Sequence, residues 1–348
     1  LMELLIYLLI YILTIWFIFF PKSLPSNYFF IFWLSISMCL SLIIRSSIGE
    51  TSSSDIDGYI GNMMYPEIIS LNYYLREFIF WFGIRFLYSI IGDGAMVFVF
   101  LDFIFYLCLY KGFSLCRRAY YPQIGQRDVN YLFFAVLLFF PVVMGMHNIY
   151  RQLLASTIFL ISIGLIGNSK PIKGYLTSLV AVFIHNAVGM FLPVLMVCTK
   201  NKLFHYMAFI ILIPIIFFTS GVDESSSGLI SRDGSIEIGK TIKYMYLISL
   251  FLAYTFFIYI EWNSNLKLHS TFIAIFSILI IMYAANLIGF SSEQAQRTFF
   301  YISSILFPFL GYYCFIKFKP RILSSLIFFH ISLLPLILIF NTTIDLSL

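Results

Sequence analysis

Long apolar segments follow one another along the whole chain and are separated by short polar stretches. The clearest of them are 3–20, 28–44, 94–110, 131–146, 149–167, 203–219, 242–260, 271–289, 298–316 and 322–340. A helix of about twenty residues crosses the roughly 30 Å hydrocarbon core of a bilayer. Strands of a membrane β-barrel would alternate apolar and polar residues, and these segments do not alternate. The pattern predicts an all-α, polytopic integral membrane protein with about 10–13 transmembrane or partly embedded helices.

Two further segments fit a full span less well. Residues 71–91 contain several charged side chains, which are costly in a helix surrounded by lipid. Residues 174–198 have His185 and Asn186 near their centre and basic residues at both ends. Each half of this segment has about 12 residues, or about 18 Å of helix, which is too short to cross. We predict that 71–91 is a partly embedded helix at the outer face. We also predict that 174–198 enters the membrane and returns, with a hinge at His185.

The distribution of Lys and Arg indicates the orientation of the chain, because basic residues concentrate in the short cytoplasmic loops of membrane proteins. This rule places four basic segments in the cytoplasm: 111–128, 168–173, 199–202 and 317–321. The outer loops are then 45–76, 220–240 and 290–297. No linker divides the chain, so we expect a single multi-span membrane domain over 1–348.

The composition and the absence of certain motifs argue against several classes of function. The chain is 61% hydrophobic and 11% charged, and its formal net charge of +5 is too small and dispersed for nucleic-acid binding. The sequence has no H-E-x-x-H zinc motif, no P-loop and no G-x-S-x-G motif. We therefore expect no nucleic-acid partner, no metal site and no cofactor.

Polar residues gather at the outer end of one predicted span, in the sequence GMHNIYRQLLAST. Arg151 lies in the first turn of this span, and His147 lies four residues earlier on the same predicted helix face. Arg297 begins another outer-end span, one turn before Tyr301. Helix N-termini attract anions, and guanidinium groups bind phosphate oxygens bidentately, so two such arginines predict a diphosphate site. Alternatively, Arg151 extends to lipid headgroups and Arg297 pairs with a glutamate on its own helix.

His185 and Asp102 are two further ionisable residues, each near the middle of a predicted membrane segment. The imidazole of His185 can accept a proton from a sugar hydroxyl; the alternative is a hydrogen-bonded packing residue. A mid-span carboxylate such as Asp102 costs about 2.5–3.5 kcal/mol on insertion scales. We therefore expect Asp102 to pair with an arginine, such as Arg85.

Several of these residues form short motifs whose order is informative. The motifs are Asp55-Ile-Asp-Gly-Tyr59, the aromatic segment led by Glu77, Asn148-Ile-Tyr-Arg151-Gln152-Leu-Leu-Ala155, Phe183-Ile-His185, and the late Arg297. In this order they resemble the EpsG/Wzy group of bacterial O-antigen and polysaccharide polymerases over most of the chain. The sequence GETSSS makes the link between Arg45 and Asp55 longer than is usual in this group, which leaves the participation of Arg45 open.

The resemblance implies a glycosyltransferase of the bacterial inner (cytoplasmic) membrane with its active site facing the periplasm. Such a polymerase transfers a growing undecaprenyl-diphosphate-linked glycan onto an incoming lipid-linked oligosaccharide repeat of an O-antigen, capsule or exopolysaccharide. Its expected partners are the lipid-linked donor and acceptor, membrane lipids, a chain-length regulator and a flippase. Alternative functions are a lipid-linked oligosaccharide flippase or other transporter, and a membrane polysaccharide acyltransferase.

Roles can be assigned to individual residues on this basis. The expected catalytic residues are His185, Arg151 and Arg297. The expected substrate-binding residues are Asp55, Tyr59, Glu77, Arg85, His147, Asn148, Gln152, Arg232 and Tyr301.

Overall fold

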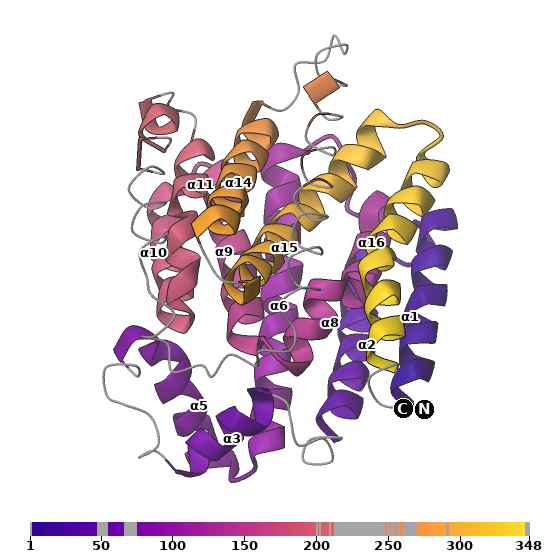
Figure 1. Cartoon of the computed structure of the whole chain (residues 1–348). Coiled ribbons are helices and arrows are strands. Elements are labelled where there is room, and N and C mark those ends of the chain that lie inside the picture. The colour runs from indigo at the N-terminus through magenta and orange to yellow at the C-terminus, as the bar shows by residue number, and fades with distance from the viewer. Residues whose placement is uncertain are drawn as a thin grey trace.

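The computed structural model is a bundle of helices (Figure 1). The structure describes residues 2–46, 55–65, 75–199, 201, 203–208, 210–211, 270–289 and 292–344, with a few single positions between 248 and 259. In the last three helices, side chains are described at 273–284 and 298–334. Every regular element in these ranges is a helix, which confirms the all-α prediction. Most of the predicted spans 203–219 and 242–260, and the whole of loop 220–240, lie outside the described residues.

Five of the described helices are long and apolar enough to cross a membrane. They are α1 (Met2–Phe19), α2 (Ser26–Ser46), α6 (Gly94–Tyr120), α9 (Tyr150–Gly167) and, over its part from Thr298, α15 (Ser292–Lys317). Shorter apolar stretches lie in α14 (Ser270–Gly289) and α16 (Arg321–Ile344). These helices confirm a polytopic membrane protein.

The segment predicted as a span over 131–146 consists of two helical parts, which together are long and apolar enough to form one broken span. Its first part contains η2 (Arg127–Val129), α7 (Asn130–Ala135) and η3 (Val136–Leu138), and its second part is α8 (Phe140–His147). The two parts are bent by 45° at Phe139, whose backbone is extended. Pro141 explains the break, because proline has no N–H to bond the carbonyl four residues earlier in a continuous helix.

Both segments predicted to be too short for a full span are short helices. The first is α5 (Phe78–Ile91), which follows Glu77 and ends at Gly92 with a positive φ of 75°. The second is α10 (Pro171–Ile184), followed by η4 (Asn186–Phe191) and α11 (Leu192–Val197). The break between α10 and η4 lies at His185, whose extended backbone ends α10 at the predicted hinge.

Helix α9 is the most buried of the candidate spans and packs most extensively against α6 and α10. Two glycines permit its neighbours to approach closely. A Cβ atom at Gly145 on α8 would lie 2.7 Å from Leu153 Cβ, and one at Gly174 on α10 would lie 2.4 Å from Ile166 Cγ1. Small residues allow such close backbone contact between membrane helices. The helix that carries Arg151 is therefore held tightly at both ends.

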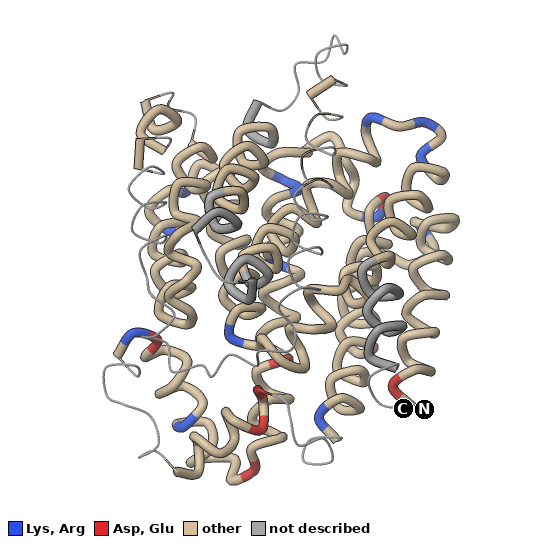
Figure 2. Tube along the Cα trace, in the orientation of Figure 1, with Lys and Arg blue, Asp and Glu red and all other residues tan. Residues whose placement is uncertain are grey.

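The two ends of the bundle differ in charge. Helices α3 (Asp55–Met64) and α5 lie at the same end as the start of α1, whereas the connection between α15 and α16 lies at the opposite end (Figure 1). Acidic and basic residues occur together at the α3–α5 end, whereas the α15–α16 connection carries basic residues (Figure 2).

Candidate functional site

Side chains from several of the predicted motifs meet at the end of the bundle that carries α3 and α5. Glu77 lies directly before α5, Arg151 in the first turn of α9, and His185 between α10 and η4. Arg151 Nη1 pairs with Glu77 Oε2, and His185 Nδ1 lies 2.9 Å from Glu77 Oε1. Arg151 Nε also donates a hydrogen bond to the hydroxyl of Tyr59 on α3, at 3.2 Å. The carboxylate of Glu77 therefore bridges the two predicted catalytic residues.

Glu77 is buried and ionised. Its side chain is 4% exposed, and its Oε1 accepts a further hydrogen bond from the backbone N–H of Asn186 at 3.3 Å. Burial alone would raise the pKa of the Glu77 carboxyl. The contacts with His185 and Arg151 outweigh burial, so the pKa of the Glu77 carboxyl lies below its ordinary value. At neutral pH Glu77 is therefore an anion that pairs with Arg151 and lies in contact with the His185 ring.

Aromatic rings surround the guanidinium group of Arg151. Its Cζ atom lies 5.0 Å from the ring centroid of Trp81, 5.2 Å from that of Tyr59 and 5.9 Å from that of Phe80. Cation–π contacts of this kind attract a guanidinium group and restrict its orientation. Arg151 is therefore fixed within the protein, not extended to lipid headgroups as the alternative interpretation required.

His185 also contacts α15. Its ring and that of Tyr301 are 6.0 Å apart in an edge-to-face arrangement, and Phe191 contacts the same tyrosine at 5.2 Å. Where Nδ1–H faces the carboxylate of Glu77, the lone pair of a neutral imidazole is on Nε2. This arrangement resembles other catalytic sites in which a carboxylate orients a histidine that accepts a proton.

The other predicted substrate-binding residues of these motifs lie on the same helix ends. Asp55 is exposed at the first residue of α3, one turn before Tyr59. Gln152 follows Arg151 and is buried. Asn148 is half-buried in the break between α8 and α9, where its backbone N–H bonds to the carbonyl of Met144. Their roles in binding stay predictions.

His147 does not share a helix face with Arg151, so that prediction was wrong. It is the last residue of α8, and the chain leaves the helical conformation before α9 begins. Its Nε2 atom instead lies 3.1 Å from Oε1 of Glu3 on α1. The helical spacing of four residues was misleading because two separate helices meet between these positions.

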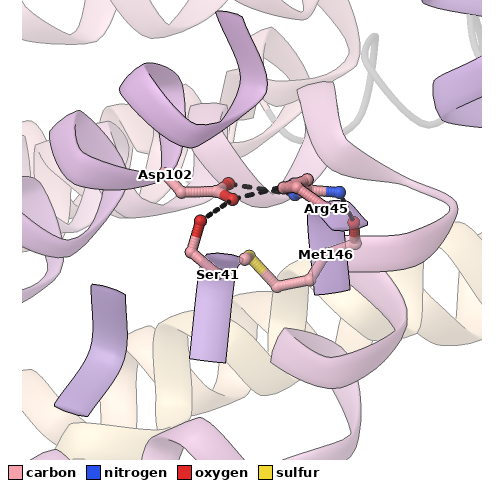
Figure 3. Close-up of polar contacts among 4 residues, drawn as sticks. All are labelled: Ser41, Arg45, Asp102 and Met146. Atoms are coloured by element: carbon pink, nitrogen blue, oxygen red, sulfur yellow. Dashed lines mark hydrogen bonds and ion pairs between the residues drawn. The ribbon is translucent and has the colours of Figure 1, made fainter. Parts of the chain in front are cut away.

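Asp102 pairs with an arginine, as predicted, but the partner is Arg45 and not the suggested Arg85. Arg45 Nε lies 2.8 Å from Asp102 Oδ2 and Nη2 lies 3.0 Å from Oδ1, and Ser41 donates to Oδ2 at 2.7 Å (Figure 3). Both charged side chains are almost completely buried between α2 and α6. Arg85 is half-buried on α5. The sequence left the participation of Arg45 open, whereas the structure gives it a defined partner.

Two predicted residues cannot be placed fully. Arg232 lies outside the described residues, and Arg297 lies on α15 with its side chain outside them. Across the side chains that the structure describes, no three His, Cys, Asp or Glu residues are close enough to hold a metal ion.

The comparisons with known proteins concern almost the whole chain. The sequence model of the EpsG family matches residues 30–346. This range includes Tyr59, Glu77, Arg151 and His185. No curated protein and no solved structure matches the chain.

Proposed function

Because the chain belongs to the EpsG family, we propose that it is a polysaccharide polymerase that lengthens an undecaprenyl-diphosphate-linked glycan. The observation that carries this proposal is the bridge from Arg151 through Glu77 to His185. It combines a cation suited to a diphosphate with a histidine suited to accept a proton from a hydroxyl. Both groups accelerate a glycosyl transfer with a diphosphate leaving group.

The reaction follows from these groups. A hydroxyl of the incoming lipid-linked repeat attacks the anomeric carbon of the growing glycan. The bond from that carbon to the diphosphate oxygen breaks, and undecaprenyl diphosphate leaves with the bonding electrons. His185 Nε2 takes the proton of the attacking hydroxyl, and Arg151 stabilises the charge that develops on the departing diphosphate.

Glu77 positions the other two residues in this scheme, and its charge makes a second cation necessary for binding a diphosphate. It holds the plane of the Arg151 guanidinium group and the orientation of the His185 ring. The negative charge of Glu77 offsets the positive charge of Arg151. Binding of a diphosphate therefore needs a second cation. We propose Arg297 for this role, because its position on α15 is one helical turn before Tyr301, which contacts His185.

The polymerase proposal can be tested with purified components. We expect the purified protein and purified lipid-linked repeats to produce a ladder of longer lipid-linked glycans, together with free undecaprenyl diphosphate. Transport of the repeat across liposomes without lengthening would instead support a flippase. Transfer of an acyl group to the repeat, without a new glycosidic bond, would support an acyltransferase.

The same proposal places the α3–α5 end of the bundle at the periplasmic face of the bacterial inner membrane. We expect an impermeant maleimide to label Ser89→Cys on α5 from the periplasmic side. Lys170→Cys, between α9 and α10, should react only after the membrane is opened, since basic connections stay in the cytoplasm. The two variants are compared in a background without native cysteines. Labelling of Lys170→Cys alone from the periplasmic side would reverse the orientation.

A further inference from the structure

A second, fully buried arginine lies close to the candidate site without being part of it. The Arg45–Asp102 pair uses two of the guanidinium nitrogens of Arg45. The third, Nη1, donates a hydrogen bond of 2.7 Å to the backbone carbonyl of Met146 (Figure 3). A single side chain thus ties α2 to both α6 and α8.

The carbonyl of Met146 lies next to the start of the helix that carries Arg151. Met146 lies in the last turn of α8, directly before the break that leads into α9. Arg151 follows only five residues later, in the first turn of α9. Arg45 therefore contacts the backbone next to the break between α8 and α9, five residues before Arg151.

Aromatic contacts make a second connection between the two arginines. Arg45 Cζ lies 5.3 Å from the ring centroids of both Phe98 and Tyr150, and Tyr150 immediately precedes Arg151. Phe98 stacks on Tyr59 at 6.2 Å. Tyr59 in turn accepts the hydrogen bond from Arg151 Nε. The backbone contact and the aromatic contacts of Arg45 thus both lead to Arg151.

From these contacts we infer that Arg45 is a positioning residue, which fixes the break between α8 and α9 and thereby the place of Arg151. This inference rests on the proposed function for the role of Arg151. A buried ion pair is weak evidence for stability, because desolvation offsets the attraction between the charges. A displacement of about 1 Å at a reacting centre, in contrast, can lower a rate about a hundredfold.

Two variants separate the positioning contact from the ion pair. Arg45→Lys can keep a charge pair with Asp102, but its single ammonium nitrogen replaces the fork that reaches Asp102 and Met146 together. Ser41→Ala removes only a hydrogen bond to Asp102 and leaves the contact with Met146. The readouts are the polymerisation rate and the hydrogen–deuterium exchange of backbone amides 147–151 in detergent.

We expect Arg45→Lys to increase exchange of these amides and to lower the polymerisation rate about tenfold or more. Ser41→Ala should keep both within about twofold of wild type. Unchanged exchange in Arg45→Lys, or equal effects in the two variants, would overturn the inference. Increased exchange with normal polymerisation would also overturn it, because the break would then not control Arg151.

A further variant guards against a folding defect. Arg45→Met combined with Asp102→Leu removes both buried charges, and such replacements often leave stability unchanged. We expect this double variant to melt near the wild-type temperature and still to show rapid exchange and slow polymerisation. If the double variant has wild-type activity and exchange, the Arg45–Asp102 pair is only structural and the inference is wrong. If the wild-type protein makes no polymer, the proposed function fails, and exchange at 147–151 still decides whether Arg45 fixes the break.

Discussion

Arg151→Lys should lower the polymerisation rate about a hundredfold or more while the protein still folds. Loss of one preorganised donor to developing negative charge costs a factor of about 10²–10³ in comparable sites. Lysine keeps the positive charge but has a single donor nitrogen, so it cannot reproduce the planar fork that contacts Glu77 and Tyr59. The rate is measured with purified lipid-linked repeats, by the appearance of longer glycans and of undecaprenyl diphosphate.

Arg321→Lys is the matched control, because Arg321 is exposed at the first residue of α16, next to the connection at the opposite end of the bundle. It should polymerise at the wild-type rate, and both variants should melt near the wild-type temperature in detergent. A normal rate in Arg151→Lys would mean that charge alone is sufficient at this position and that the planar fork of the guanidinium group plays no part.

His185→Gln should lower the polymerisation rate about a hundred- to ten-thousandfold, the usual cost of losing a general base. The glutamine amide can still donate to Glu77, so the bridge to Arg151 should persist. An amide does not accept a proton at neutral pH, which separates proton transfer from positioning. Binding of the lipid-linked repeat, measured on the same preparation, should stay within about threefold of wild type.

Two outcomes would contradict this role for His185. A rate within a few-fold of wild type would make the histidine structural and would direct the search for a base to His147, Asp55 and Asp57. Loss of repeat binding would show that His185 positions the donor or the acceptor. Asp102 is a poor substitute in either case, because Arg45 and Ser41 already contact its carboxylate.

Much of the fold could be predicted from residue patterns because the bilayer imposes simple requirements. Long apolar segments gave the spans that became α1, α2, α9 and α15. Length and charge together indicated a hinge at His185, where α10 indeed ends. Pro141 was the available signal for the bend at Phe139, but hydropathy averaged over 131–146 concealed it.

The candidate site was predictable as a set of motifs but not as a geometry. The resemblance grouped Tyr59, Glu77, Arg151 and His185, and the structure brings them into contact. The bridging role of Glu77 depends on three chain segments meeting, which no local spacing encodes. The pair between Arg45 and Asp102 is a similar case, because 57 positions separate its partners and Arg85 was an equally reasonable partner from the sequence.

The close approach of α8 and α10 to α9 has a consequence for genetic screens. Substituting Gly145 or Gly174 with any larger residue forces Leu153 or Ile166 aside and shifts α9 without touching a substrate. A library selected for loss of surface glycan will therefore recover these glycines alongside Arg151 and His185. Sensitivity to mutation will not by itself distinguish chemistry from helix spacing here. The abundance of each variant in the membrane, measured in the same cells, will make this distinction. A variant that loses chemistry reaches the membrane in normal amounts but is inactive.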